Sequence, residues 1–395
     1  MATLRRMRTL RKLIVIGALV GLAAACSDDT SSTGTAVAPA TEATSVEAVE
    51  TTVAEAVEIT VADTAPQETA PLETTPTVAG WETIVAPADC MCADGSEFSY
   101  FVRRANPAKV MFFFEGGGAC FNAKNCNPAS STYKQSVGSG ASGEGIFDFD
   151  NPLNPFADYS VVYVPYCTGD VHIGNATTDY GDGVVIEHKG YINGTTALDS
   201  LVELFPDATE LVVTGESAGS IPSPLYAGLA ADLLPDARIT VLADGSGAYP
   251  DLPTLNPVVG GAWGVMNAVP DWPTNADVTP ENWSLPGLFI RAHQHAADIA
   301  FARHDYAFDP VQTFFMSLLA IPTDDLPAMI DATEAQIEAA GANVSSYVSP
   351  GAGHTVLSGP GFYTETTEGS SLVEWVTDFV AGDEVADVRC TVCTP

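Results

Sequence analysis

The chain has 395 residues, 46% of them apolar, and a formal net charge of −35. This apolar content is enough for one large hydrophobic core. Residues 81–395 contain 40 acidic residues and ten basic ones. This charge disfavours binding to nucleic acid and acidic membrane surfaces and argues against unmodified polygalacturonate, a polyanion, as a substrate.

The first 80 residues differ in composition from the remainder. A basic start is followed by an apolar run over 13–25, so residues 1–25 are predicted to be a secretory signal, too short for a spanning helix. The signal ends in "GLAAAC", which is similar to the lipobox of bacterial lipoproteins and makes Cys26 a candidate for lipidation. Ordinary cleavage near Ala25 is the alternative.

Residues 26–80 are predicted to form a disordered stalk that lifts the following domain off a membrane. After Cys26 the segment contains ten acidic residues, no basic residue and no aromatic residue. Such a composition cannot bury enough apolar surface to offset the entropy of ordering. The sequence therefore predicts an exported protein, held at the cell surface by a lipid anchor or secreted, whose globular domain is 81–395.

Eight cysteines are present. With Cys26 assigned to lipid, seven remain in an exported domain, where thiols tend to pair, so we expect three disulfides and one free thiol. The C-x-C and C-x-x-C pairs lie at opposite ends of the domain without adjacent histidines. We therefore predict no zinc site and no other metal.

Apolar runs alternate with amphipathic segments from residue 81 onward. Strands are predicted at 109–114, 160–166, 210–214, 238–243, 287–292 and 344–349, and helices at 196–205, 225–234, 329–340 and 371–380. Near-continuous apolar strands alternating with helices predict an α/β fold with a doubly wound, mostly parallel sheet. Residues 251–285, rich in Pro, Asn and Trp, are predicted to be an irregular insertion or lid.

In such sheets the functional groups follow the carboxyl ends of strands. "EGGGACF" follows the first predicted strand, and its glycines can turn N–H groups toward one point, as an oxyanion hole requires. Gly117 and Gly118 are the candidate donors, together with Ala218. A flexible turn is the alternative interpretation.

"GESAGS" follows the predicted strand 210–214 and fits the G-x-S-x-G pattern of a nucleophile elbow. The flanking glycines allow backbone and helix to approach closely around a strained serine, which makes Ser217 the candidate nucleophile. A tight strand-to-helix turn without catalytic function is the alternative.

The general base and its acid are expected from later strand ends. His354 lies in "SPGAGHTVLS" after the last predicted strand, and Asp298 lies shortly after the predicted strand 287–292. Ser217, Asp298 and His354 then occur in the chain order of α/β hydrolases. Asp244 and Asp305 are alternative acids. Asp244 is followed by a "DGSG" turn, where an aspartate commonly bonds its own backbone.

Several segments together resemble the pectin acetylesterase/Notum family of serine esterases, over roughly residues 90–360. They are "CADGSEFSYF", "FFFEGGGACFNAKNC", "VYVPYCTGDVHIGN", "GYINGTTALDSL", "VVTGESAGS", "VLADGSGAY" and "GAGHTVLS". The resemblance implies an α/β-hydrolase-like fold and a Ser217–Asp298–His354 triad. It also implies oxyanion donors at Gly117, Gly118 and Ala218.

The same resemblance implies two disulfides, Cys120–Cys126 and Cys92–Cys167, and assigns no partners to Cys90, Cys390 and Cys393. Some relatives carry Trp after the glycines where this chain has Ala119, which implies a different acyl pocket. The "YCTGDVHIGN" loop brings Asp170 and His172 near the site, either to brace the oxyanion turn or to act directly.

These features together predict a serine carboxylesterase that needs no cofactor. It is expected to release acetate from an O-acetylated glycan such as pectin. A lipid or polyester carboxylesterase with the same triad and a catalytically inactive surface-binding module are the alternatives. The sequence does not specify an oligomeric state.

Overall fold

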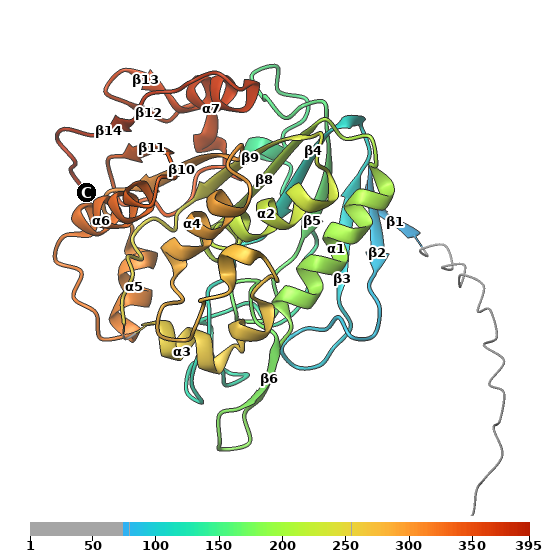
Figure 1. The fold of residues 1–395 in the computed structure, drawn as a ribbon. Helices are drawn as coiled ribbons and strands as arrows, with labels where there is room; N and C mark the ends of the chain where they lie inside the picture. Colours follow the sequence, from blue (N-terminus) through green and yellow to red (C-terminus); the bar gives the residue numbers. More distant parts are fainter. Residues whose placement is uncertain (1–73, 79, 254) are drawn as a thin grey trace, which may run out of the picture. The chain divides into compact units, whose positions relative to one another are not determined.

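The computed structural model describes residues 74–78, 80–253 and 255–395 (Figure 1). The predicted signal, Cys26 and most of the predicted stalk lie outside the described residues. The central sheet begins at β1 (Thr74–Val78), which pairs antiparallel with β2 (Trp81–Val85). The sheet therefore includes five residues that precede the predicted start of the domain at residue 81. The β-branched residues of "TTPTV" favour the extended conformation that this pairing uses.

The central sheet has ten strands in the order β1-β2-β3-β5-β4-β8-β9-β10-β11-β14. Its remaining strands are β3 (Ser99–Arg103), β4 (Asn106–Phe114), β5 (Tyr159–Val164), β8 (Glu210–Glu216), β9 (Arg238–Asp244), β10 (Ala300–Tyr306), β11 (Val344–Ser349) and β14 (Val388–Arg389). Pairing is antiparallel from β1 to β5 and parallel from β5 to β14. The sheet is therefore mostly parallel, as predicted.

The helices and minor strands surround this sheet. They are α1 (Gly190–Leu204), α2 (Ser223–Leu233), α3 (Leu255–Ala262), α4 (Leu285–His295), α5 (Pro310–Leu318), α6 (Leu326–Ala339) and α7 (Leu372–Ala381), with β6 (Ala176–Asp179), β7 (Val185–His188), β12 (Thr366–Thr367) and β13 (Ser370–Ser371). The four predicted helices correspond to α1, α2, α6 and α7.

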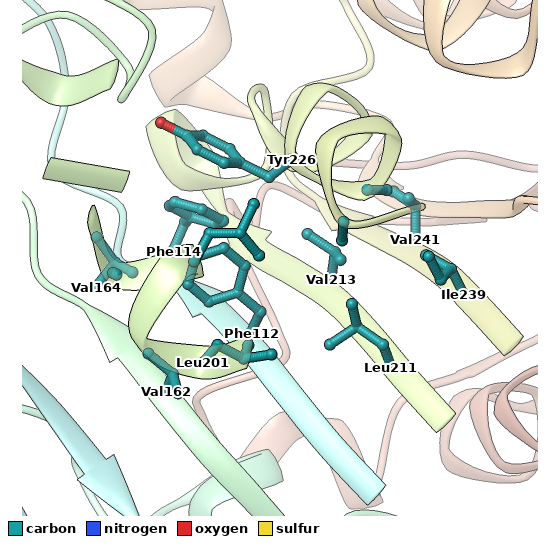
Figure 2. Packing of buried hydrophobic residues seen from close by; sticks show 14 of the residues in the cluster. Phe112, Phe114, Val162, Val164, Leu201, Leu211, Val213, Tyr226, Ile239 and Val241 are labelled. Carbon is teal, nitrogen blue, oxygen red and sulfur yellow. The ribbon is translucent and has the colours of Figure 1, made fainter. Parts of the chain in front are cut away.

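Both faces of the sheet are buried because alternate strand residues point to opposite sides. On one face Phe112, Phe114 and Val213 pack against Leu201 of α1 and Tyr226 of α2 (Figure 2). On the other face the intervening residues, such as Met111 and Phe113, share a cluster with Trp375 and Phe379 of α7. Helices on both faces make the sheet doubly wound and define which strand ends remain open.

The predicted strand at 287–292 is wrong, because these residues lie in α4. Ser284 caps this helix by accepting a hydrogen bond from the Gly287 N–H (3.1 Å), and Pro286 stands in its first turn. Buried Leu288 and Ala292 are four residues apart on one helical face. The strand that pairs with β9 on the side away from β8 is β10, "AFARHDY". Its buried arginine, histidine and aspartate interrupt the apolar pattern by which a buried strand is recognised in the sequence.

Candidate active site

The candidate nucleophile lies on a strained turn between β8 and α2. Ser217 has φ +54°, a left-handed conformation that non-glycine residues rarely adopt. A Cβ at Gly215 would lie 2.3 Å from the Gly219 carbonyl oxygen, and one at Gly219 would lie 2.0 Å from that of Phe114. The two glycines of the motif are therefore required by close backbone contacts, and the serine is held in the geometry of a nucleophile elbow.

The triple-glycine loop follows β4, the strand next to β8. A Cβ at Gly116 would lie 2.6 Å from the Glu216 carbonyl oxygen, so this loop touches the residue before Ser217. The turn is closed by the N–H groups of Ala119 and Lys134, and Gly117 and Gly118 contribute no donor to it. Among the described residues no hydrogen bond is formed by these two N–H groups, which can therefore donate to a ligand.

The candidate base has a different acid partner from the one expected. His354 Nδ1 donates to Asp309 Oδ2 over 2.7 Å, and its Nε2 has no hydrogen-bond partner among the described residues. Asp309 is fully buried at the start of α5. An Nδ1–H held by a buried carboxylate leaves Nε2 as the proton acceptor, which is the arrangement a general base needs.

Asp298 does not belong to this site. It is an exposed residue in the turn between α4 and β10, before the strand, whereas Asp309 follows the carboxyl end of β10. Residues 287–292 form a helix and not the predicted strand, so the strand whose carboxyl end is near the site is β10, and the aspartate that follows it is Asp309. "DPVQ" at 309–312 carried a usable signal: Asp at the N-cap, Pro next, and Gln three residues later predict a helix start.

Three carboxylates influence the pKa of His354. Burial alone lowers it, but the hydrogen bond and charge of Asp309, with the charges of Asp244 and Glu216, more than offset burial and raise the pKa above the usual 6.5. A base acts in its neutral form, so activity that depends on His354 should be lost as the pH falls through this raised pKa.

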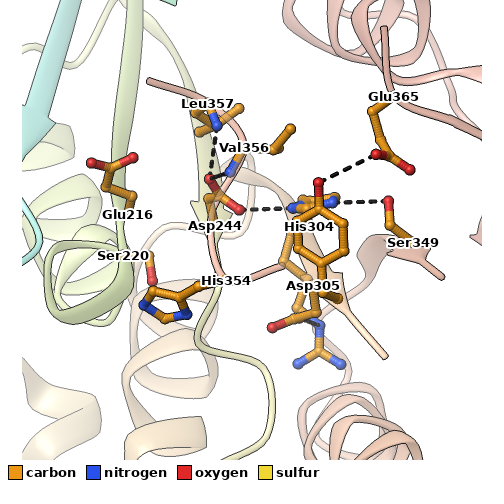
Figure 3. Close-up of polar contacts among 12 residues, drawn as sticks. Glu216, Ser220, Asp244, His304, Asp305, Ser349, His354, Val356, Leu357 and Glu365 are labelled. Carbon is orange, nitrogen blue, oxygen red and sulfur yellow. Dashed lines mark hydrogen bonds and ion pairs between the residues drawn. The ribbon is translucent and has the colours of Figure 1, made fainter. Parts of the chain in front are cut away.

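Asp244, the alternative acid, instead supports the loop that carries His354 (Figure 3). Its Oδ2 accepts hydrogen bonds from the N–H groups of Val356 (2.8 Å) and Leu357 (2.9 Å), and its Oδ1 accepts from His304 Nδ1 (2.7 Å). His304 Nε2 is hydrogen-bonded in turn to the Ser349 hydroxyl at 3.0 Å. Asp244, His304 and Ser349 are fully buried, so this second Ser-His-Asp array lies inside the fold.

We expect Asp244→Asn to lower stability more than turnover. The change removes the charge that two backbone N–H groups and His304 share, a loss of about 1–3 kcal/mol for a buried charged acceptor. Urea unfolding should show this loss, while the kcat of the folded variant should stay within about tenfold of wild type. Wild-type stability combined with lost turnover would instead identify Asp244 as the catalytic acid.

Asp305, the other alternative, bonds groups other than His354. Its Oδ1 accepts from the Gly247 N–H (2.7 Å) and from Gln312 Nε2 (3.0 Å), and Arg303 Nε lies 3.9 Å from its Oδ2. Burial raises the pKa of this carboxyl. These contacts tie β10 to the turn after β9 and leave Asp309 as the carboxylate bonded to the base.

Asp170 and His172 are both buried and form hydrogen bonds to neighbouring loop and helix residues. Asp170 accepts from the Thr168 hydroxyl (2.6 Å) and from the Gly190 N–H (2.8 Å). His172 Nε2 donates to the carbonyl oxygen of Glu115, the residue before the triple glycine, over 2.9 Å. Burial lowers the pKa of His172. These contacts favour the bracing role of the loop over a direct catalytic one.

The cysteines pair as the resemblance implies, with one pair added. Disulfides join Cys92 to Cys167, Cys120 to Cys126 and Cys390 to Cys393, and Cys90 is a buried free thiol. His188 lies beside Cys120 and Cys126, a spacing that could hold a metal. However, both sulfurs are in a disulfide, and the ring nitrogens of His188 bond Thr168 and Tyr180, so the group offers no free set of ligands.

An apolar pocket opens beside Ser217. Its empty space, counted together with the solvent at its open mouth, is about 560 Å³. Gly118 and Ala218 line it next to the serine, and Ala119 forms part of its wall. The remaining wall residues are apolar or aromatic apart from Gly245: Phe121, Val171, Ile221, Tyr249, Trp263, Leu285, Phe315 and Leu319. Two of the candidate oxyanion donors, Gly118 and Ala218, therefore line the same apolar space as the candidate nucleophile.

Comparison with known proteins finds a family match over part of this chain. Residues 77–257 match the family described as pectinacetylesterase. The matched segment is similar to that family and covers less than half of the chain. It contains the triple glycine and Ser217 but ends before Asp309 and His354, whose assignment rests on the contacts above. Within the described residues, no helix has the length and apolarity to cross a membrane.

Three relatives illustrate the similarity. The palmitoleoyl-protein carboxylesterase NOTUM of Schmidtea mediterranea is 32% identical over 145 residues, covering 33% of this chain and 26% of the relative. Pectin acetylesterase 5 of Arabidopsis thaliana is 26% identical over 167 residues (39% and 38%), and the Mus musculus NOTUM is 28% identical over 166 residues (39% and 33%). The matched region spans well under half of each relative. The similarity is to carboxylic ester hydrolases.

Proposed function

We propose that this chain hydrolyses carboxylic esters with Ser217 as nucleophile, His354 as base and Asp309 as the acid that orients it. The observation that best supports this proposal is the position of Ser217. It has a strained left-handed backbone conformation and, together with Gly118 and Ala218, lines an apolar pocket. The N–H groups of Gly117, Gly118 and Ala218 are the proposed oxyanion donors.

The proposed reaction proceeds through an acyl-enzyme. Ser217 Oγ attacks the ester carbonyl while His354 Nε2 takes its proton and then gives it to the departing alcohol oxygen. A water molecule, deprotonated by the same nitrogen, attacks the acyl-enzyme and releases the acid with Ser217 restored. Asp309 keeps the proton on Nδ1 and stabilises the imidazolium that forms in each half-reaction.

The pocket favours an acyl group longer than acetyl, presented on a glycan or another alcohol. Its apolar and aromatic walls gain free energy from each methylene that they remove from water, about 0.8 kcal/mol per CH₂. The second candidate is an acetylesterase of O-acetylated glycans such as pectin, which the pectinacetylesterase family match favours. In either case no cofactor is proposed, and the three disulfides suit an exported, surface-anchored or secreted enzyme.

A p-nitrophenyl ester series from acetate to palmitate tests the proposal. We expect kcat/KM to rise from acetate to hexanoate by up to about fourfold per CH₂. Ala119→Trp, which places a large ring in the pocket wall, should abolish this rise and spare acetate. A maximum at acetate with a steady fall thereafter would favour the acetylesterase, and no turnover of any ester would leave only a binding module.

A further inference from the structure

Gln312 is a fully buried polar residue that the proposed mechanism does not use. It lies in the first turn of α5, three residues after Asp309. A glutamine at this position of a capping box usually reaches back to the N-cap N–H. Here the amide instead contacts two carboxylates and a neighbouring loop.

The orientation of this amide is fixed by its surroundings. Its Oε1 accepts from the Ala248 N–H over 2.8 Å, so the NH₂ group must face the other way. Nε2 then donates to Asp309 Oδ2 and to Asp305 Oδ1, both over 3.0 Å. Since every donor and acceptor of the side chain is used, the amide cannot turn without losing a buried hydrogen bond.

The same contacts complete the hydrogen bonding of the Asp309 carboxylate. Its Oδ1 accepts from the backbone N–H groups of Val311 (2.7 Å) and Gln312 (3.0 Å). Its Oδ2 accepts from His354 Nδ1 and from Gln312 Nε2. The helix cap thus holds one oxygen, and Gln312 is the second donor on the oxygen that faces the base.

We propose that Gln312 is a positioning residue that acts through Asp309: its amide aims Oδ2 at His354 Nδ1 and shares the negative charge of that oxygen. This inference rests on the proposed function. Without the amide, Asp309 Oδ2 accepts a hydrogen bond from His354 alone. The carboxylate then stabilises the imidazolium more strongly, which raises the pKa of His354, and only the helix cap fixes the orientation of the carboxylate.

The titratable and charged groups around this network are few. Asp305 and Arg303 come from β10, Glu216 from β8 and Asp244 from β9, and the buried Tyr249 hydroxyl belongs to the turn after β9. None of them donates a hydrogen bond to Asp309 Oδ2 in the described structure, so none replaces the amide when it is removed.

The test compares Gln312→Met, Gln312→Glu and wild type by the pH dependence of kcat on a p-nitrophenyl ester. Methionine keeps the volume and glutamate keeps the shape, but neither supplies two N–H donors. We expect kcat to fall about tenfold, as loss of a hydrogen bond to a charged group allows. KM should change less than about twofold, and the acid-limb midpoint should rise by about half a unit or more.

Gln336→Met is the matched control. Gln336 lies on α6, and its Oε1 accepts from the Asp251 N–H over 2.8 Å just as that of Gln312 accepts from Ala248, but it does not contact Asp309. This variant should keep the wild-type kcat and midpoint. A folded Gln312→Met or Gln312→Glu with the wild-type midpoint would overturn the proposal, even if kcat falls.

A double variant separates failure of this inference from failure of the proposed function. In an Asp309→Asn background, Gln312→Met should have no further effect on kcat, since its only route to the base has been removed. A full additional loss would show that Gln312 acts elsewhere and overturn the inference. Undiminished turnover in Asp309→Asn alone would instead reject Asp309 as the acid.

Discussion

Ser217→Ala should reduce ester hydrolysis by roughly 10⁴-fold or more while the protein stays folded. The hydroxyl is the proposed attacking group, and removal of a nucleophile from a triad costs about as much as removal of the whole triad. Alanine has the same difficulty as serine at φ +54°, so the backbone strain is unchanged. Initial rates with a p-nitrophenyl ester at saturating substrate measure the loss.

Ser223→Ala is the matched control for this variant. Ser223 is a buried serine six residues further along, whose hydroxyl contacts the Gly219 carbonyl oxygen at 3.3 Å. Its removal deletes the same atom from the same helix region and should leave kcat within about tenfold of wild type. Comparable losses in the two variants would point to a structural effect rather than to the nucleophile.

Asp309→Asn should lower kcat by roughly 10²–10⁴-fold with little change in fold. Asparagine is as good an N-cap as aspartate, so its Oδ1 can still accept from the Val311 and Gln312 N–H groups. Its NH₂, however, would replace the oxygen that faces His354 Nδ1. Two donors would then confront each other, and the imidazole would favour the tautomer with Nε2 protonated, which cannot accept the serine proton.

Asp298→Asn provides the paired control. Asp298 is exposed at the opposite end of β10, so its substitution should leave kcat and stability close to wild type. Circular dichroism and thermal unfolding should show both variants folded. If Asp298→Asn loses turnover and Asp309→Asn retains it, the acid assigned from the structure is wrong and the one expected from the sequence is right.

The sheet and the nucleophile elbow could be predicted because their signals are local. β4, β5, β8 and β9 are nearly continuous apolar runs, and the G-x-S-x-G pattern of Gly215, Ser217 and Gly219 occupies five consecutive residues. The same applies to the glycines after β4. Each of these patterns is contained in a window of fewer than ten residues and can therefore be recognised in the sequence, although the backbone atoms that the glycines approach lie on other segments as well.

The candidate acid Asp309 could not be placed from the sequence because the strand before it, β10, has an unusual composition. β10 contains buried Arg303, His304 and Asp305, whose partners come from distant elements: Glu334 for Arg303, Asp244 for His304 and Gly247 for Asp305. A strand that buries charges next to remote partners has no apolar periodicity to detect. Over a short window the apolar residues of α4 resemble a strand more closely than those of β10 do. The strand was therefore predicted in the wrong segment, and the expected acid, Asp298, was chosen from the residues that follow it.

The pairing of Cys390 with Cys393 could not be predicted although the two cysteines are only three residues apart. C-x-x-C is compatible with a metal site, a redox pair or a structural disulfide, and seven cysteines allow many pairings. Only the three-dimensional arrangement shows which sulfurs meet. The expected total of three disulfides and one free thiol is confirmed for the described residues.

Mass-spectrometric mapping of a fluorophosphonate adduct tests the central claim most directly. The probe phosphonylates a serine only where a base activates it and an oxyanion site receives the phosphoryl oxygen. We predict one adduct per chain, on Ser217 in the peptide containing "GESAGS", and its disappearance in His354→Ala as well as in Ser217→Ala. Labelling of a different serine, or equal labelling of Ser217→Ala, would contradict the account.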